Sequence, residues 1–401
     1  MRILHLAYED PAQPGSGGGS VRVREINRRL GERHEIVAIV AGYPDARPRV
    51  ADGVRWVPLG LRSRSISRNR VSYLALLGAA IRRYPHDLLV EEFSAPCSTT
   101  FSPLFTARPV VASVQWLFAA EMRAKYGLPF DVVERTGLGL YHDFIAVSEW
   151  LGGTLRARRP DATVETIHNG VDPLAFAVDP APPEHLLYVG RLENKQKGCD
   201  LLLESIARAR AVLGDRLPPV LFVGDGPDRE TLVRQTARLE LADIVRFVGR
   251  VDGRAKYQLM ASAYAVLMPS RWESFGMVAV EGMAVGAPVV AFDVGPLAEI
   301  TGAGGARLVP PFDIDRFAHE IVLVVSAGAN LTSERWSNRR WARRFDWDHI
   351  ATQQEEHYLR ATASARPRRS WRRVRAATRE ETQEVRRIAE QNVVAAGGKP
   401  R

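Results

Sequence analysis

Short runs of apolar residues recur along the first half of the chain, with helical spacing between them. Val21, Val23, Ile26 and Leu30 stand at intervals typical of a helix, directly after a glycine-rich stretch. Runs of strand length flank this helix and continue beyond it, at Ile3–Ala7, Ile36–Val40, Leu88–Val90, Val110–Val114 and Phe144–Val147. Strands that alternate with helical segments are typical of a parallel sheet covered by helices.

A second series of strand-length runs follows, at Leu186–Val189, Val220–Val223, Val245–Val248, Ala265–Met268 and Val289–Phe292. The two series are separated by Asp179–Pro183, a proline-rich stretch that predicts a stiff joint. We therefore expect two α/β domains, at residues 1–178 and 184–344, that face each other across a cleft. Ligands of such sheets bind at the carboxyl ends of the strands, so both domains should aim their loops at that cleft.

The last part of the chain differs in composition from the two domains. A helical stretch, Ile350–Leu359, lies within a segment that we place at residues 345–362. Residues 363–401 form a basic tail, which holds eleven bases and four acids from Arg366 on, a net +7 of the chain's formal +9. Its pattern demands no core, which favours a solvated or disordered tail. Bases without interleaved aromatics or a binding fold predict only nonspecific contact with nucleic acid.

The bulk composition is typical of a globular protein with two domains and without a membrane-spanning helix. The chain has 401 residues, of which 46% are hydrophobic and 25% charged. No apolar run approaches the roughly 20 residues that a membrane-spanning helix needs. The first strand runs directly into Glu9 and Asp10, which is unlike a secretory signal, so we expect a cytoplasmic protein. Cys97 and Cys199 have neither a disulfide framework nor metal-ligand spacing, which favours buried free thiols.

The segment Ser270–Glu281 gives the strongest chemical signal, because it follows a strand and leads into an apolar helix. A helix N-terminus leaves backbone N–H groups unpaired and can hold a phosphate. Gly276 would let a ligand approach the backbone closely. Glu281, about one turn into the helix, could reach a ribose hydroxyl pair, while Glu273 faces the opposite side. The alternative is that Ser274 simply caps the helix.

Two cations follow the strand that opens the second series. Gly190-Arg191 ends this strand, and Lys197-Gly198 opens the next helix. Arg191 and Lys197 could clamp a diphosphate from two directions and neutralise the charge that develops on a leaving nucleotide. The alternative is a pair of solvated surface cations. The loop Gly224–Pro227 lies at the same edge and is interpreted as structural.

In order and spacing, these motifs resemble family 4 of the retaining glycosyltransferases, which have the GT-B fold of two Rossmann-like domains. The resemblance extends over the body of the chain, and its motifs are specific in combination. They include two glutamates separated by seven residues, Glu273 and Glu281. The other matching motifs are Gly17–Gly19, Asn169–Asp172, Gly190-Arg191, Lys197-Gly198, Gly224–Pro227 and Phe247–Gly249.

The resemblance implies a nucleotide-sugar donor, a hydroxyl acceptor and a hexosyltransferase-type reaction in the synthesis of glycans, glycolipids or polysaccharides. Arg191, Lys197 and Glu273 would act at the donor phosphates and sugar. Glu281 would bind the donor ribose, and Val251 would meet the base through its backbone. The stretch from Phe345 to Leu359 would return and pack on the first domain.

Backbone groups would hold the donor diphosphate. Gly18, with Gly19 beside it, would close on the phosphates from the first domain, and Gly190 would form the matching turn in the second. The facing amides would be those of Ser274, Phe275, Gly276, Met277 and Val278. The resemblance also implies that the reaction needs no metal ion and no cofactor besides the donor, because protein cations and helix dipoles replace the metal.

One position departs from the family pattern. The family has a histidine just after the strand that matches Val110–Val114, whereas this chain has Gln115. Gln115 cannot transfer a proton, but it could hydrogen-bond the donor sugar, and in a front-side displacement the leaving phosphate oxygen can accept the acceptor's proton. His5, His142 and His168 are alternative general bases, each also interpretable as structural.

The acceptor side carries less information. Arg62, Arg64, Arg68 and Arg70 precede the apolar stretch Val71–Ile81. A basic loop beside an amphipathic helix can bind an anionic membrane or an acidic, lipid-linked acceptor. The alternative is a solvated loop and a core-facing helix.

Two other enzyme classes share parts of this pattern. A dinucleotide-dependent dehydrogenase would need an acidic residue at the end of its second strand to bind the ribose. Here that strand reads Val37–Gly42 without an acid, which excludes this class. A sugar-nucleotide epimerase of GT-B architecture remains as an alternative.

Overall fold

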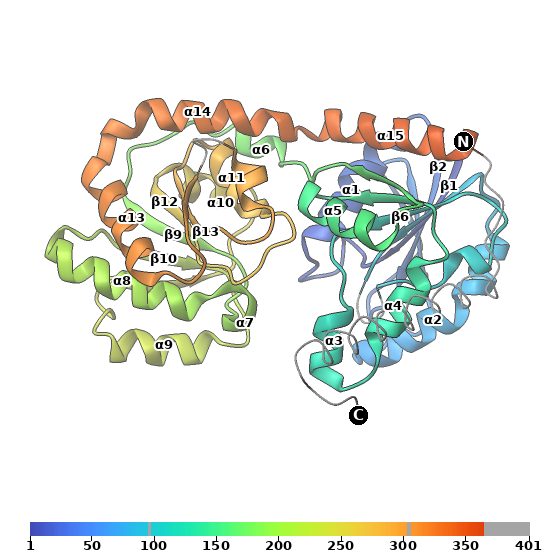
Figure 1. The fold of residues 1–401 in the computed structure, drawn as a ribbon, viewed down its shortest axis with the longest axis horizontal. Helices are drawn as coiled ribbons and strands as arrows, with labels where there is room; N and C mark the ends of the chain where they lie inside the picture. Colours follow the sequence, from blue (N-terminus) through green and yellow to red (C-terminus); the bar gives the residue numbers. More distant parts are fainter. Residues whose placement is uncertain (95–97, 303–305, 365–401) are drawn as a thin grey trace, which may run out of the picture. The chain divides into compact units, whose positions relative to one another are not determined.

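The computed structural model describes residues 1–94, 98–302 and 306–364, which fold into two compact units (Figure 1). The first unit consists of Met1–Ala146, Gly152–Ile167 and the chain from Ala351 on. The second consists of Val147–Leu151 and His168–Ile350. The basic tail, apart from its first two residues, lies outside the described residues.

The proline-rich stretch at 179–183 lies inside the second unit and not at the boundary between the units. The Ala181 amide donates a hydrogen bond to Ala261 O at 3.1 Å. The Arg335 guanidinium donates to Ala181 O at 3.2 Å. The stretch in which we expected a joint is therefore bound to the second unit, whose long segment begins earlier, at His168.

The first unit is built on an eight-stranded sheet with the order β3-β4-β2-β1-β5-β6-β7-β8. All neighbouring strands are parallel except β3 and β4. The sequence pattern did not reveal β3, β4 and β8, because they are short or rich in polar residues. The strands are β1 (Arg2–Tyr8), β2 (Glu35–Ala41), β3 (Arg49–Ala51), β4 (Val54–Leu59), β5 (Leu88–Glu92), β6 (Val110–Val114), β7 (Asp143–Ala146) and β8 (Thr163–Thr166).

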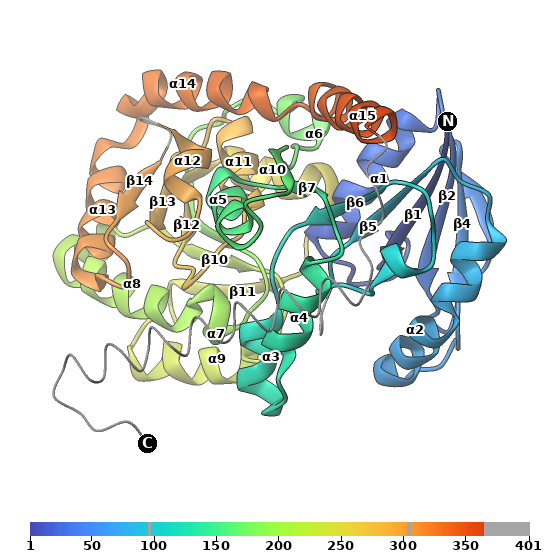
Figure 2. The ribbon, with the colours of Figure 1, turned by 45° about the vertical axis from the view of Figure 1, so that its right-hand side comes forward.

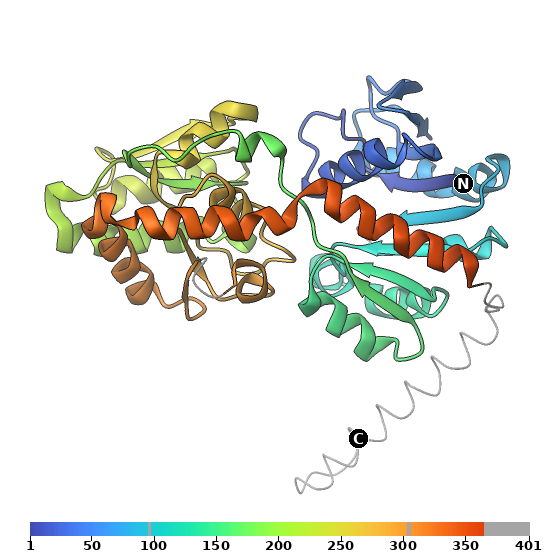
Figure 3. The ribbon, with the colours of Figure 1, turned by 90° about the horizontal axis from the view of Figure 1, so that it is seen from above.

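Helices cover both faces of this sheet. On one face, α2 (Ile66–Arg83) buries Tyr73, Leu77 and Ile81 against strand residues that include Leu4 and Leu6 (Figure 2). His5 points to the opposite face, because side chains alternate along a strand, and there it meets α1 (Gly18–Leu30). The end of α15 (Trp347–Ala363) lies on the side of α1 (Figure 3). The remaining helices are α3 (Ala119–Tyr126), α4 (Phe130–Leu138), α5 (Glu149–Arg158) and the short η1 (Ser102–Leu104).

The C-terminal part of α15 is tied to the first unit by polar contacts. His34 and Arg33 both contact Glu355, at 2.6 Å and 2.5 Å. His357 lies 2.7 Å from the Glu165 carboxylate. These contacts anchor the helix to the strand-and-helix layers of that unit.

The second unit holds a fully parallel six-stranded sheet with the order β11-β10-β9-β12-β13-β14. Helices α8, α9 and α13 gather on one face, and α10, α11 and α14 on the other (Figure 1). The strands are β9 (His185–Val189), β10 (Val220–Val223), β11 (Val245–Gly249), β12 (Ala263–Met268), β13 (Val289–Phe292) and β14 (Arg307–Val309). The helices are α6 (Pro173–Phe176), α7 (Asn194–Lys197), α8 (Cys199–Leu213), α9 (Arg229–Arg238), α10 (Gly253–Ala261), α11 (Met277–Ala284), α12 (Leu297–Thr301), α13 (Ile314–Ala327) and α14 (Thr332–Ala342), with the short η2 (Gly214–Arg216), η3 (Gly328–Leu331) and η4 (Arg343–Phe345).

Both sheets share one feature that predicts where a ligand binds. In the second sheet, the strands that follow β9 in the chain add on one side of it as β10 and β11, and then on the other side as β12, β13 and β14. In the first sheet, the corresponding change of direction lies between β1 and β5. At such a point the connections leave to opposite faces and open a crevice at the carboxyl ends of the two central strands. The loops after β1, β5, β9 and β12 are therefore the positions to examine.

Two expectations about bulk properties can be compared with the structure. Across the described ranges, no helix has the length and apolarity required to cross a bilayer. Cys199 is a buried free thiol, and burial raises its pKa to about 11. Cys97 lies outside the described residues.

Candidate functional site

Lys197 and Glu273 meet at the carboxyl edge of the second sheet, in the crevice between β9 and β12. Lys197 is the last residue of α7, which follows β9, and Glu273 lies in the loop after β12. Lys197 Nζ lies 2.6 Å from Glu273 Oε1, and Ser270 Oγ donates a hydrogen bond to the same oxygen at 2.8 Å. Glu273 is only 6% exposed. A buried carboxylate needs such partners, because an unpaired charge in this position would be costly.

The two loops that carry this pair are locked together by main-chain contact. Gly198 has a φ of +62°, and a Cβ placed on it would lie 2.0 Å from Pro269 O. The Arg271 amide donates to Gln196 O at 2.8 Å. The Arg271 guanidinium forms two hydrogen bonds with the Asp200 carboxylate, at 2.7 Å and 2.8 Å. This fork holds the loop after β12 on the start of α8, which fixes Glu273 opposite Lys197.

Arg191 lies at the same edge but is not part of this cluster. Its side chain is 65% exposed, and its ion pair is with Glu193, at 3.6 Å. The glycines beside it serve close packing, since a Cβ on Gly224 would lie 1.9 Å from Gly190 O. An exposed and loose ion pair contributes little to stability, so the Arg191 guanidinium can exchange this partner for a ligand.

Helix α11 begins without a side-chain cap. Its N-cap is Gly276, with a φ of +93°, so the alternative in which Ser274 caps the helix is wrong. The Ala279 amide donates to Gly276 O at 2.9 Å. The preceding amides, of Met277 and Val278, belong to the first turn, where a helix has no internal acceptor. They are the natural donors to an anion.

Phe275 contributes to this site through its backbone alone. Its side chain is 1% exposed and packs against His168 and Phe345, with ring centroids 6.0 Å and 5.7 Å away. Burial of the ring holds the Ser274–Gly276 turn at the start of α11.

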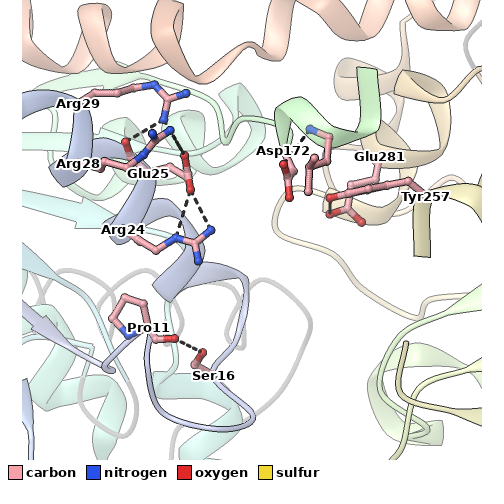
Figure 4. A network of polar contacts seen from close by, with 10 residues as sticks. Pro11, Ser16, Arg24, Glu25, Arg28, Arg29, Asp172, Tyr257 and Glu281 are labelled. Carbon is pink, nitrogen blue, oxygen red and sulfur yellow. Dashed lines mark hydrogen bonds and ion pairs between the residues drawn. The ribbon is translucent and has the colours of Figure 1, made fainter. Parts of the chain in front are cut away.

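Glu281 is the centre of a second buried polar group (Figure 4). Its Oε1 accepts hydrogen bonds from Lys256 Nζ at 2.9 Å and from the Tyr257 hydroxyl at 3.4 Å. Burial and the nearby Glu281 carboxylate raise the pKa of Tyr257. Val251, half-buried, lies two residues beyond the end of β11 at the same edge. Sequence reasoning did not find Lys256 and Tyr257, because no motif or spacing links α10 to Glu281.

The first unit presents the glycine cluster and Gln115 at the carboxyl edge of its sheet. The Gly17 amide donates to Glu9 Oε2 at 3.1 Å, and Gly18 begins α1. A Cβ on Gly19 would lie 3.1 Å from Gln115 Nε2, so the missing side chain leaves space for this amide. The structure thus brings together Gln115 and the cluster, which are almost a hundred residues apart in the sequence.

Two of the three histidines considered as bases have a carboxylate partner. His5 is 1% exposed, and its Nε2 lies 3.3 Å from Glu92 Oε1. His168 Nε2 lies 3.0 Å from Glu299 Oε1. Both ring nitrogens of His142 are buried. Sequence reasoning did not find Glu92, since nothing in the sequence separates it from the adjacent Glu91.

Comparison with known proteins places this geometry in a family. A family model described as "Glycosyltransferase Family 4" matches residues 16–173, and one described as "Glycosyl transferases group 1" matches residues 183–326. The phosphatidyl-myo-inositol mannosyltransferase of Mycobacterium leprae is 33% identical over 369 residues, which cover 88% of this chain and 95% of the relative. The chain belongs to family 4 of the glycosyltransferases.

Other relatives match over a smaller part of their length. The glycogen synthase of Mycobacterium tuberculosis is 32% identical over 215 residues, which cover 51% of this chain and 50% of that protein. The D-inositol 3-phosphate glycosyltransferase of Jonesia denitrificans is 33% identical over 233 residues, which cover 53% of this chain and 54% of that enzyme. The chain thus aligns with about half the length of these two family members.

Solved structures identify the fold of the family. Sucrose-phosphate synthase from Thermosynechococcus elongatus has a TM-score of 0.75 at 21% identity and covers 90% of this chain and 99% of its own. Anabaena HepE, solved in complex with UDP, has a TM-score of 0.68 at 19% identity and covers 89% of this chain and 99% of its own. The two Rossmann-like sheets of this chain therefore form a GT-B fold, as the sequence predicts.

The structure places most of the family-4 positions in three groups. Lys197 pairs with Glu273, Glu281 pairs with Lys256 and Tyr257, and Gln115 lies over the glycine cluster. Arg191 is separate, with an exposed side chain. In the part of the chain that the structure describes, no three histidine, cysteine, aspartate or glutamate side chains are grouped to hold a metal ion. Metal independence itself stays a prediction.

The main-chain contact at Gly198 gives a test of how the site is built. We expect Gly198→Ala to lower the free energy of unfolding by roughly 2–5 kcal/mol, from left-handed strain plus overpacking against Pro269 O. Gly253 is the matched control, because it has the same φ of +62° and no atom within 4 Å of its ideal Cβ. Gly253→Ala should cost only the strain, about 1–2 kcal/mol. Urea unfolding of both variants measures the difference, and equal losses would contradict the proposed packing constraint.

Proposed function

We propose that this chain is a retaining glycosyltransferase that moves a sugar, of hexose type, from a nucleotide-sugar donor to a hydroxyl acceptor. The observation that carries this proposal is the Lys197–Glu273 ion pair in the crevice between β9 and β12, in a chain of family 4. The pair places a fixed cation near the uncapped start of α11. Both features attract the diphosphate of such a donor.

The donor half of the proposed site lies in the second unit. Lys197 and Arg191 would neutralise the charge that builds up on the leaving diphosphate, and the Met277 and Val278 amides would bind its oxygens. Glu281, held by Lys256, would accept hydrogen bonds from the ribose hydroxyls. These groups are preorganised, so little reorganisation is needed when charge develops.

Glu273 would serve the reaction in two ways. Its carboxylate holds the Lys197 ammonium in place at 2.6 Å. A donor phosphate that binds Lys197 would share this cation with Glu273, whose other oxygen could then accept a hydrogen bond from a sugar hydroxyl. The proton of the acceptor hydroxyl would pass to the leaving phosphate oxygen, so no histidine base is required.

We propose an anionic or lipid-linked acceptor on the side of α2. Residues 53–86 contain seven arginines and no acid. The outer face of α2 exposes Ile66 and Val71, at 69% and 67%, while Tyr73 faces the core. Arg62 and Arg64 lie in the loop before α2, whereas Arg68 and Arg70 belong to the helix and not to the predicted loop. The outer side of α2 therefore exposes apolar residues together with Arg68, which suits peripheral contact with an anionic membrane. Two relatives carry phosphatidyl-myo-inositol and inositol 3-phosphate in their names.

The test of the proposed function is a thermal-shift panel with UDP-glucose, GDP-mannose, ADP-glucose and dTDP-glucose. A ligand that binds only the folded state at 100 times its Kd stabilises that state by about 2.7 kcal/mol. The donor that raises the melting temperature is then incubated with candidate acceptors. Transfer of the sugar supports the proposal. Conversion of the donor to its epimer without transfer would favour the epimerase alternative, and no shift with any donor would overturn the proposal.

Removal of the Lys197 ammonium should weaken donor binding. We expect Lys197→Ala to raise the Kd of the donor found in the panel by about 100-fold, because truncating one partner of a buried charge pair typically costs about 2–5 kcal/mol. Lys195→Ala is the matched control, since Lys195 lies on the same short helix with an exposed side chain. Titration calorimetry should give a Kd within about twofold of wild type for this control. Equal affinities of wild type and Lys197→Ala for the donor would contradict the proposal that Lys197 binds its diphosphate.

The reaction should need no divalent metal ion. The proposed site neutralises the diphosphate with Lys197, Arg191 and helix amides, so EDTA should leave turnover unchanged. Loss of activity in EDTA that manganese or magnesium restores would contradict this prediction.

A further inference from the structure

Glu92 is the last residue of β5, the strand that lies next to β1 where the order of the first sheet changes direction. It is 7% exposed. The adjacent Glu91 points to the other face of the sheet, where it accepts hydrogen bonds from the Thr100 amide and the Tyr141 hydroxyl, both at 2.6 Å. Two neighbouring glutamates therefore serve different environments, and only Glu92 faces the glycine cluster and Gln115.

Both carboxylate oxygens of Glu92 have partners. Oε1 lies 3.3 Å from His5 Nε2, and Oε2 accepts a hydrogen bond from Gln115 Nε2 at 3.5 Å. His5 is held in turn by Asn27 of α1, with 2.9 Å between Nδ1 and Oδ1. The bond to Gln115 is longer than a typical N–H···O hydrogen bond.

A buried cation interacts electrostatically with Glu92. Arg22 of α1 is 1% exposed, and burial lowers the pKa of its guanidinium while the negative charge of Glu92 opposes this decrease. In the contact between Gln115 and Glu92, the amide Nε2 donates and the carboxylate Oε2 accepts. The Gln115 amide must therefore turn its NH2 group toward Glu92, since its oxygen would be repelled there.

We propose that Glu92 is a positioning residue that fixes the amide of Gln115, so that Gln115 Oε1 is presented to a hydroxyl of the donor sugar as a hydrogen-bond acceptor. This inference rests on the proposed function. Among the described residues, Oε1 receives no hydrogen bond, whereas Nε2 donates to Glu92 and lies where a Cβ on Gly19 would come within 3.1 Å of it. The Gln115 amide oxygen can therefore only accept a hydrogen bond from a ligand. A donor sugar that binds there must supply the hydrogen from one of its hydroxyl groups.

The experiment compares the affinity for a nucleotide sugar with the affinity for its nucleoside diphosphate. One ligand is the nucleotide sugar that binds in the panel above. The other is the nucleoside diphosphate of the same base, which is UDP, GDP, ADP or dTDP. Titration calorimetry gives the Kd of each ligand. The ratio of the two affinities isolates the contacts to the sugar from those to the nucleotide. It is measured for wild type, Gln115→Ala, Glu92→Asp and the double variant.

Glu92→Asp keeps a carboxyl group at this position but withdraws it from Gln115 by one methylene. We expect Gln115→Ala and Glu92→Asp each to lower the affinity ratio by about 3- to 10-fold, the contribution of one hydrogen bond. The double variant should lose no more than Gln115→Ala alone, because Glu92 acts through Gln115. A structural role of Glu92 would instead lower the melting temperature and leave the ratio unchanged.

Glu91→Gln is the matched control, because it alters the adjacent carboxylate on the opposite face of the strand, and its affinity ratio should stay within about twofold of wild type. Losses that multiply in the double variant, or an unchanged ratio in either single variant, would overturn the inference while donor binding stands. Failure of every donor to bind wild type would instead overturn the proposed function.

Discussion

Main chain packed directly on main chain at the carboxyl edge of the second sheet is the constraint on which the rest of the site depends. A Cβ on Gly224 would lie 1.9 Å from Gly190 O, and one on Gly198 would lie 2.0 Å from Pro269 O. Gly295 approaches Glu273 O in the same manner, at 2.4 Å from its ideal Cβ. Because no side chain separates these loops, the groups that follow β9, β12 and β13 converge on one small volume. Lys197 and Glu273 can then meet across 76 residues of sequence.

The buried charges of the two units follow one physical rule. Glu273 is balanced by Lys197, Glu281 by Lys256, and Glu92 faces both Arg22 and His5. Burying such pairs gains little stability over well-packed apolar residues, because desolvation offsets much of their attraction. Their value lies in preorganisation, since each pair holds a polar group in a fixed direction before a ligand arrives. The exposed Arg191 is the exception, and its loose contact with Glu193 suits a cation that changes partners on binding.

The position of Gln115 shows how a departure from the family pattern can be accommodated locally. A histidine can donate or accept a proton, whereas the Gln115 amide can do neither. Its Nε2 donates to the Glu92 carboxylate, and the amide occupies the space that a side chain on Gly19 would need. These neighbours give the amide a single orientation and a single hydrogen-bonding polarity. This orientation fits the proposed hydrogen bond with a sugar hydroxyl, and an amide does not transfer a proton.

The sequence by itself determined the two Rossmann-like sheets and the loops that carry the site, because strand periodicity and glycine turns are local signals. Lys197, Glu273 and Glu281 could be named as candidates in this way, since each follows the end of a predicted strand. Only the tertiary structure decided which charges pair: Lys256 with Glu281, and Glu92 with Gln115. It also placed the proline-rich stretch inside the second unit, whose long segment begins at His168. These features depend on packing between segments that lie far apart in the chain. Local residue patterns do not specify which distant side chains come into contact.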